Sequence, residues 1–183
     1  MLILRRLLAL ALVSVTCASR LEIRQATNTN AAINQIIDKV DVTVRQVGST
    51  ILTIQANHTM NSATLENQIT TIETAFRNMD NSILVTPVSS GSTTVSPTND
   101  DISITLSDAM QLVATSLSGV VASGTVPDFS NMVATLDPIM SNALTHFNHT
   151  LPGGLLLVHI MMLDASQFLA DEGFVDTLQT LGF

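Results

Sequence analysis

Apolar residues recur three and four positions apart along four stretches of the chain, and this periodicity restricts the fold more than any other feature. Such spacing places side chains on one face of an α-helix. We therefore predict amphipathic helices over residues 28–56, 65–84, 100–121 and 129–147. In the second stretch the apolar positions are Leu65, Ile69, Ile72, Phe76, Met79 and Ile83.

A fifth stretch, Leu155–Leu163, differs because it is apolar on every side apart from His159. A helix over this stretch is about 14 Å long, far short of the roughly 30 Å of hydrocarbon in a bilayer, so we expect no membrane span. A helix that is apolar all round and too short to cross a membrane is expected to be enclosed by other helices. The segment continues with one apolar face to Leu181, with an interruption at Gly173.

These segments predict an all-α fold of about five amphipathic helices in a single bundle, with no strand. The bundle domain is expected to span residues 26–183. A Ser/Thr/Pro-rich stretch at residues 86–99 breaks the periodicity and is expected to be a loop between two helices. The interior of such a bundle is either plain core or the wall of a central apolar cavity, and the spacing does not distinguish the two.

The N-terminus has the three parts of a secretory signal peptide. Arg5 and Arg6 precede the apolar run Leu7–Val15, and small residues follow it. We predict a signal peptide over residues 1–19, and a second cleavage after Arg24 is an additional option. A signal peptide predicts a secreted protein of the extracellular space or cell wall. The only cysteine, Cys17, lies in this segment, so the mature protein has no disulfide and depends on its core for stability.

The charge distribution is strongly asymmetric. Removal of Arg5 and Arg6 lowers the formal net charge from −8 to −10, and residues 78–183 contain acids but no Lys or Arg. Such a surface repels phosphate backbones and anionic headgroups, so we expect no nucleic-acid binding and no electrostatic membrane binding. The sequons at Asn57 and Asn148 make these two residues candidate glycosylation sites.

The histidines are the first candidates for chemistry, and none has the partners that a site requires. His146 and His149 are three residues apart, but no second ligand pair accompanies them, so we predict no metal site. His159 is either a satisfied core histidine or a polar group that faces a ligand's carboxylate. No nucleophile elbow, zincin helix, phosphate loop or dinucleotide turn is present, so we predict no catalytic residue and no cofactor.

The order of segments and several short matches point to a family. The chain has a signal peptide, two amphipathic helices, a Ser/Thr-rich connection at Val88–Pro97, and three further helical segments. The later segments contain Leu106-Ser-Asp-Ala-Met-Gln-Leu-Val, His146-Phe147 and Leu151-Pro-Gly-Gly-Leu155. Over residues 26–181 this layout resembles the fungal hydrophobic surface binding protein A family, which includes cell wall galactomannoproteins.

The resemblance implies a secreted, all-helical protein that adsorbs to hydrophobic surfaces and helps to recruit a secreted, polyester-degrading hydrolase. It also implies a second ligand class, because some galactomannoprotein relatives hold fatty acids in a central cavity. The chain departs from many members of the family in having no lysine after Lys39, which weakens the case for a partner bound through salt bridges.

We therefore predict a non-enzymatic protein that binds hydrophobic surfaces or fatty acids through the apolar interior of the bundle. Flexible methionines suit adaptable apolar surfaces as well as irregular cores. The candidate lipid-binding residues are Met110, Val113, Leu117, Met132, Leu136, Met140, Leu144, Phe147, Leu156, His159, Ile160 and Leu163. The alternative is a glycosylated structural or effector-type interaction protein with a solid core. A hydrolase is a third class, which requires His159 or His146 to lie beside a serine and an aspartate.

Overall fold

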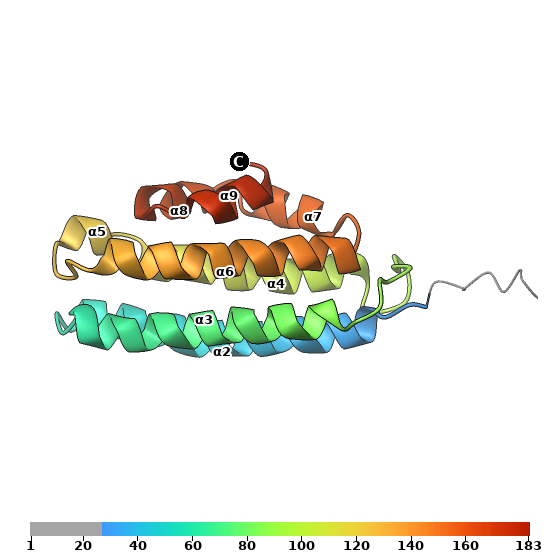
Figure 1. Cartoon of the computed structure of the whole chain (residues 1–183), viewed down its shortest axis with the longest axis horizontal. Coiled ribbons are helices and arrows are strands. Elements are labelled where there is room, and N and C mark those ends of the chain that lie inside the picture. Colours follow the sequence, from blue (N-terminus) through green and yellow to red (C-terminus); the bar gives the residue numbers. More distant parts are fainter. Residues whose placement is uncertain (1–26) are drawn as a thin grey trace, which may run out of the picture.

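The computed structural model describes residues 27–183, and the predicted signal peptide and cleavage sites lie outside these residues. The described chain is all-helical, which confirms the predicted fold class (Figure 1). The helices are α2 (Asn30–Ala56), α3 (Ser62–Leu84), α4 (Asn99–Leu117), α5 (Val120–Ser123), α6 (Phe129–Thr150), α7 (Gly154–Met161), α8 (Ser166–Glu172) and α9 (Val175–Leu181).

The helices lie in three layers. Helices α2 and α3 form one outer layer, α4 and α6 form the middle layer, and α7, α8 and α9 form the other outer layer (Figure 1). Helix α2 packs against α3 and α4, and α3 packs against α6. On the opposite side of the middle layer, α7 packs on α4 and α9 packs on α6. The middle layer is therefore covered on both sides, and it supplies much of the core.

The four predicted amphipathic helices correspond to α2, α3, α4 and α6. All six apolar positions predicted for residues 65–84 are buried in α3. The buried side chains of all layers join in one hydrophobic cluster that runs from Ile33 to Leu181. Helix α4 begins with a reciprocal cap, in which Asp101 and Thr98 each accept a backbone N–H of the other.

The third helix is shorter than predicted. Helix α4 ends at Leu117, and the chain turns at Gly119, whose φ of +80° suits glycine far better than other residues. Only a single helical turn, α5, follows. Val121, which was expected to lie on the buried face of a continuous helix, is consequently exposed.

The fifth segment forms three helices instead of one interrupted helix. The predicted break at Gly173 is present, with a φ of +90°. A second break, which the sequence analysis did not predict, separates α7 from α8, and the two helices are bent by 81° relative to each other. After this bend α8 packs against α4 and α5.

The Ser/Thr/Pro-rich connection is folded against the start of α2. The buried Asn30 side chain accepts a hydrogen bond from Ser89 Oγ at 2.6 Å and donates to Pro97 O and Asn99 Oδ1, each at 2.9 Å. The predicted inter-helix connection is present, although α4 begins inside its predicted C-terminal bound. A buried polar network with all its partners present orders the loop that carries it.

Candidate functional site

Most of the candidate lipid-binding residues lie in the packed core between the layers. The residues with no exposed surface are Met110, Val113, Leu117, Leu136, Met140, Leu144 and Phe147, while Met132 is partly buried. A cavity that could hold an acyl chain leaves accessible surface on the side chains of its wall, and these seven have none. In this fold they line no cavity, and a lipid must displace packed side chains to reach them.

The remaining apolar candidates lie on the outside of the molecule. Leu156, Ile160 and Leu163 are 68%, 52% and 57% exposed, so the prediction that other helices enclose the whole of Leu155–Leu163 is wrong. Helix α7 belongs to an outer layer and packs through one side only, where Leu155, Val158 and Met162 are buried. Because the helix is apolar all round, its other side presents leucine and isoleucine to water.

Further apolar side chains from the last helix and the C-terminus extend this surface. Val175 is 69% exposed and Phe183 is 44% exposed. We name the set the C-terminal apolar face, and it consists of Leu156, Ile160, Leu163, Val175 and Phe183. Contiguous exposed apolar patches are uncommon on soluble monomers and mark interaction sites.

His159 connects the two parts of this face. Its ring stacks on Phe183 with 4.4 Å between the ring centroids, and its Nδ1 lies 3.0 Å from Leu181 O. The histidine is partly buried at the junction of α7 and the C-terminus, with a backbone carbonyl as its polar partner. It therefore positions Phe183 beside α7, and its role in holding a ligand's carboxylate stays a prediction.

Beyond Phe183 the face continues into a shallow groove over α8 and α9. The groove has a volume of about 560 Å³. Its lining residues are Ser166, Gln167, Ala170, Phe174, Val175, Leu178, Gln179 and Phe183. Since Val175 and Phe183 belong to both, the groove and the C-terminal apolar face form one surface of α7, α8 and α9.

Two glycines set the position of α7. Gly153 precedes the helix with a φ of +85°, and Gly154 is buried against Phe147. A Cβ on Gly154 would lie 2.9 Å from Phe147 Cε1, which is too close for a normal contact. The Pro152-Gly-Gly sequence thus permits a sharp turn and a close approach of α7 to the end of α6.

Helix α9 is held to the middle layer by a buried aspartate. The carboxylate of Asp137, in α6, accepts the backbone N–H groups of Asp176 and Thr177, each at 2.8 Å. These two donors lie in the first turn of α9, where helix N–H groups have no partner within the helix. Asp137 is 6% exposed and satisfies them from a neighbouring element.

Helix α8 is held by a second buried carboxylate. Glu172 Oε1 accepts the N–H of Gly119 at 2.7 Å, and Glu172 Oε2 lies 3.4 Å from the N–H of Val121. Burial raises the pKa of Glu172 above its ordinary value of 4.5, and the hydrogen bonds from the α4–α5 turn oppose this rise. Asp137 and Glu172 together anchor the layer that carries the C-terminal apolar face.

The other histidines do not assemble a nucleophilic site. His146 Nδ1 lies 2.5 Å from Asp80 Oδ1, a hydrogen bond that joins α6 to α3, and within residues 27–183 no serine hydrogen-bonds to this pair. His149 is exposed near the end of α6. Within residues 27–183, no group of three His, Cys, Asp or Glu side chains is arranged to hold a metal ion.

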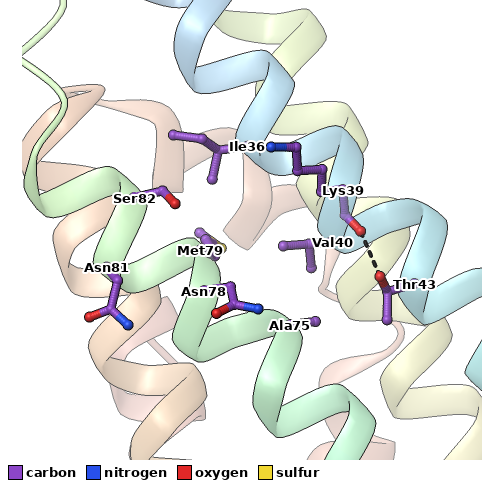
Figure 2. Close-up of a pocket in the computed structure, with 9 residues that line it drawn as sticks. All are labelled: Ile36, Lys39, Val40, Thr43, Ala75, Asn78, Met79, Asn81 and Ser82. Carbon is purple, nitrogen blue, oxygen red and sulfur yellow. Dashed lines mark hydrogen bonds between the residues drawn. The ribbon is translucent and has the colours of Figure 1, made fainter.

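A second groove lies between α2 and α3, on the opposite outer layer. Figure 2 shows its nine lining residues, and the groove has a volume of about 370 Å³. Ile36, Val40 and Met79 supply its apolar part, and Lys39, the only lysine of the chain, lies with several amide and hydroxyl groups around them. No pair of opposed titratable groups is present among these residues, so the groove offers no acid–base chemistry.

Both sequon asparagines are exposed. Asn57 lies in the turn between α2 and α3, and Asn148 lies in the last turns of α6. Thr150, the hydroxyl residue of the second sequon, is buried, and its carbonyl accepts the N–H of Ser89. Attachment of a glycan at either asparagine stays a prediction.

One helical stretch, Asn99–Ser123, is long and apolar enough to cross a membrane by length and composition. Half of its most apolar window is buried against other helices, as in the core helix of a soluble protein. A single stretch of this kind is weak evidence for a membrane span, because buried core helices have the same length and composition.

Neither the exposure of Val175 and Phe183 nor the anchoring role of Asp137 and Glu172 was predicted from the sequence. Val175 is followed by Asp176, and nothing in the local pattern indicates which other apolar residues lie beside it. One feature of the sequence could have indicated Asp137 and Glu172 as anchors, because each is an acid in a region that contains no Lys or Arg. Their partners are backbone N–H groups that lie 39 and 53 residues away in the chain.

No protein-family model and no curated protein sequence matches this chain. The resemblance to the hydrophobic surface binding protein A family therefore stays a prediction that rests on layout, composition and spacing.

Proposed function

We propose that this chain is a secreted, non-enzymatic protein that binds hydrophobic surfaces through its C-terminal apolar face. The observation that carries the proposal is the exposure of five large apolar side chains on one surface of α7–α9. Burying the exposed part of each side chain contributes roughly 1 kcal/mol, so contact with an apolar surface is favourable by about 5 kcal/mol before association costs. The predicted signal peptide supports secretion, and the family resemblance supports both secretion and the same class of ligand.

The outer face supports surface binding better than the interior supports lipid storage. The interior candidates are fully covered by protein, whereas Leu156, Ile160 and Leu163 need no rearrangement to meet a surface. The proposal therefore keeps the predicted ligand class and moves the contact from the interior to the C-terminal layer. The partners found for His146 and His159 support a non-enzymatic role, because neither histidine is positioned to activate a serine.

The test replaces the two exposed apolar residues of α7 and the one that follows it in the α7–α8 connection together, as Leu156→Gln/Ile160→Gln/Leu163→Gln. Glutamine keeps helix propensity and removes the apolar contact. We expect retention on an alkyl-coated sensor to fall about a hundredfold, since three contributions of roughly 1 kcal/mol are lost.

A matched control changes Val42→Gln/Leu52→Gln/Leu84→Gln, which removes three exposed apolar residues from α2 and α3. Circular dichroism should show that both variants are folded, and the control should retain wild-type adsorption. Equal losses in the two variants would contradict the assignment of the face, and no adsorption by the wild type would contradict the function.

A second candidate function is a glycosylated structural or effector-type interaction protein. The filled core and the two exposed sequon asparagines favour it. A purified chain that does not adsorb to a protein-free alkyl surface, but carries glycans at Asn57 or Asn148, would support this candidate over surface binding. Recruitment of a secreted hydrolase is compatible with either function, and binding assays with that enzyme would test it.

A further inference from the structure

The layer that carries the C-terminal apolar face contains acids as its only formally charged side chains. Residues 78–183 contain no Lys or Arg, and α7–α9 with their connections contain Asp164, Asp171, Glu172 and Asp176. Glu172 is buried, while the three aspartates are exposed. Asp164 directly follows Leu163, and Asp176 directly follows Val175, so two of these carboxylates adjoin residues of the face in the chain.

The cations of the described chain lie in a different layer. Lys39 and Arg45 are in α2 and Arg77 is in α3, and all three side chains are exposed. Figure 1 shows that α2 and α3 are separated from α7–α9 by the middle layer. Arg45 is also engaged with Asp41 at 2.8 Å and with Asp108 at 3.4 Å. Among residues 27–183, no Lys or Arg is therefore available beside the C-terminal apolar face to offset its carboxylates.

We infer that the C-terminal apolar face selects uncharged solid hydrophobic surfaces and is excluded from anionic ones. This inference rests on the proposed function and names the class of surface. At an uncharged surface the apolar side chains dehydrate, while the exposed aspartates of the same layer keep their water. At an anionic surface each of these carboxylates instead adds electrostatic repulsion, which is strongest at low salt.

The orientation of the bound molecule follows from the same arrangement. On an uncharged surface the chain lies with α7–α9 inward and α2–α3 toward solvent. Asn57, in the α2–α3 turn, then belongs to the outer layer and stays accessible.

The experiment measures retention of the purified mature protein on three alkanethiol monolayers by surface plasmon resonance. One monolayer is methyl-terminated, and the other two contain the same minor fraction of carboxylate-terminated or ammonium-terminated chains. At low salt we expect retention on the carboxylate mixture to be on the order of tenfold weaker than on the methyl surface. Salt of about 1 M, at which the Debye length is roughly 3 Å, should largely remove this difference.

Two neutralised variants identify the charges responsible. Asp164→Asn/Asp171→Asn/Asp176→Asn should recover retention on the carboxylate mixture. Asp38→Asn/Glu66→Gln/Glu73→Gln, which removes the same charge from α2 and α3, should not. Equal wild-type retention on the methyl and carboxylate surfaces, or equal recovery in the two variants, would overturn the inference and leave the proposed function intact. Failure of the wild type to bind the methyl surface would overturn both.

Discussion

At the scale of single residues, Glu172 shows how a buried carboxylate is accommodated in a region without cations. It is 6% exposed, and it accepts hydrogen bonds from backbone N–H groups at the α4–α5 turn. Backbone N–H groups serve as hydrogen-bond donors to this carboxylate, a role that a lysine or arginine side chain has at other buried carboxylates. The same hydrogen bonds fix the turn that ends α4. The carboxylate thus links the end of the middle layer to the C-terminal layer.

Removal of this carboxylate leaves the N–H of Gly119 without its partner. We expect Glu172→Ala to lower the free energy of unfolding by about 1–3 kcal/mol, which urea denaturation followed by circular dichroism will measure. The neighbouring Asp171 is exposed, so Asp171→Ala serves as the control and should change stability by less than about 0.5 kcal/mol. Similar effects of the two substitutions would show that Glu172 is not an anchor.

The raised pKa of Glu172 also predicts a pH dependence with a defined sign. A group whose pKa is higher in the folded state binds its proton more tightly there, so its contribution to stability is present below the ordinary value of 4.5 and is lost as the pH rises through the folded value. The stability of the wild type relative to Glu172→Gln should therefore be greater at about pH 4 than at pH 7. Urea midpoints at the two pH values test this, and an unchanged difference would contradict the assignment.

At the scale of elements, the C-terminal layer consists of helices too short to be stable alone. Helices α8 and α9 have seven residues each, and helices shorter than about 12 residues are marginal in water. They persist because of their buried contacts and because α6 supplies a cap for α9 through Asp137. An acid in the middle of one helix thus replaces the capping residue of another.

Substitution of this acid should loosen one helix selectively. In Asp137→Ala we expect faster amide hydrogen exchange at Asp176 and Thr177 and through the rest of α9, because the first-turn donors lose their acceptor. The amides of α3, which does not contact α9 among the packed helix pairs, provide the internal reference. Uniform acceleration across both helices would indicate global destabilisation instead of a local cap.

At the scale of the whole molecule, the Lys and Arg side chains and the C-terminal apolar face lie on opposite sides of the middle layer. Helices α2 and α3 carry the Lys and Arg side chains of residues 27–183, and the C-terminal layer carries the C-terminal apolar face together with three exposed aspartates. The adsorption, orientation and surface-charge experiments described above all depend on this arrangement. A folded bundle that carries such an apolar face can bind a surface without opening its core.

The four long amphipathic helices and most of their buried positions followed from periodicity alone. The 3.6-residue helical turn sets the spacing of the apolar residues. Residues such as Phe76 and Ile83 therefore lie on the same face of their helix, and this face is buried. The early end of α4 was not predictable in this way, because the apolar pattern continues through Val121 while the glycine at position 119 ends the helix.

The C-terminal apolar face, like the helices, was predictable only in part. Three features follow from the sequence alone, namely the amphipathic helical segments, the all-round apolar stretch at Leu155–Leu163 and the absence of Lys or Arg after Arg77. Which side of that stretch is buried depends on the tertiary packing, because a helix that is apolar all round has no periodicity to indicate its solvent face. Its place in an outer layer leaves Leu156, Ile160 and Leu163 exposed, and it brings Phe183 beside them through His159.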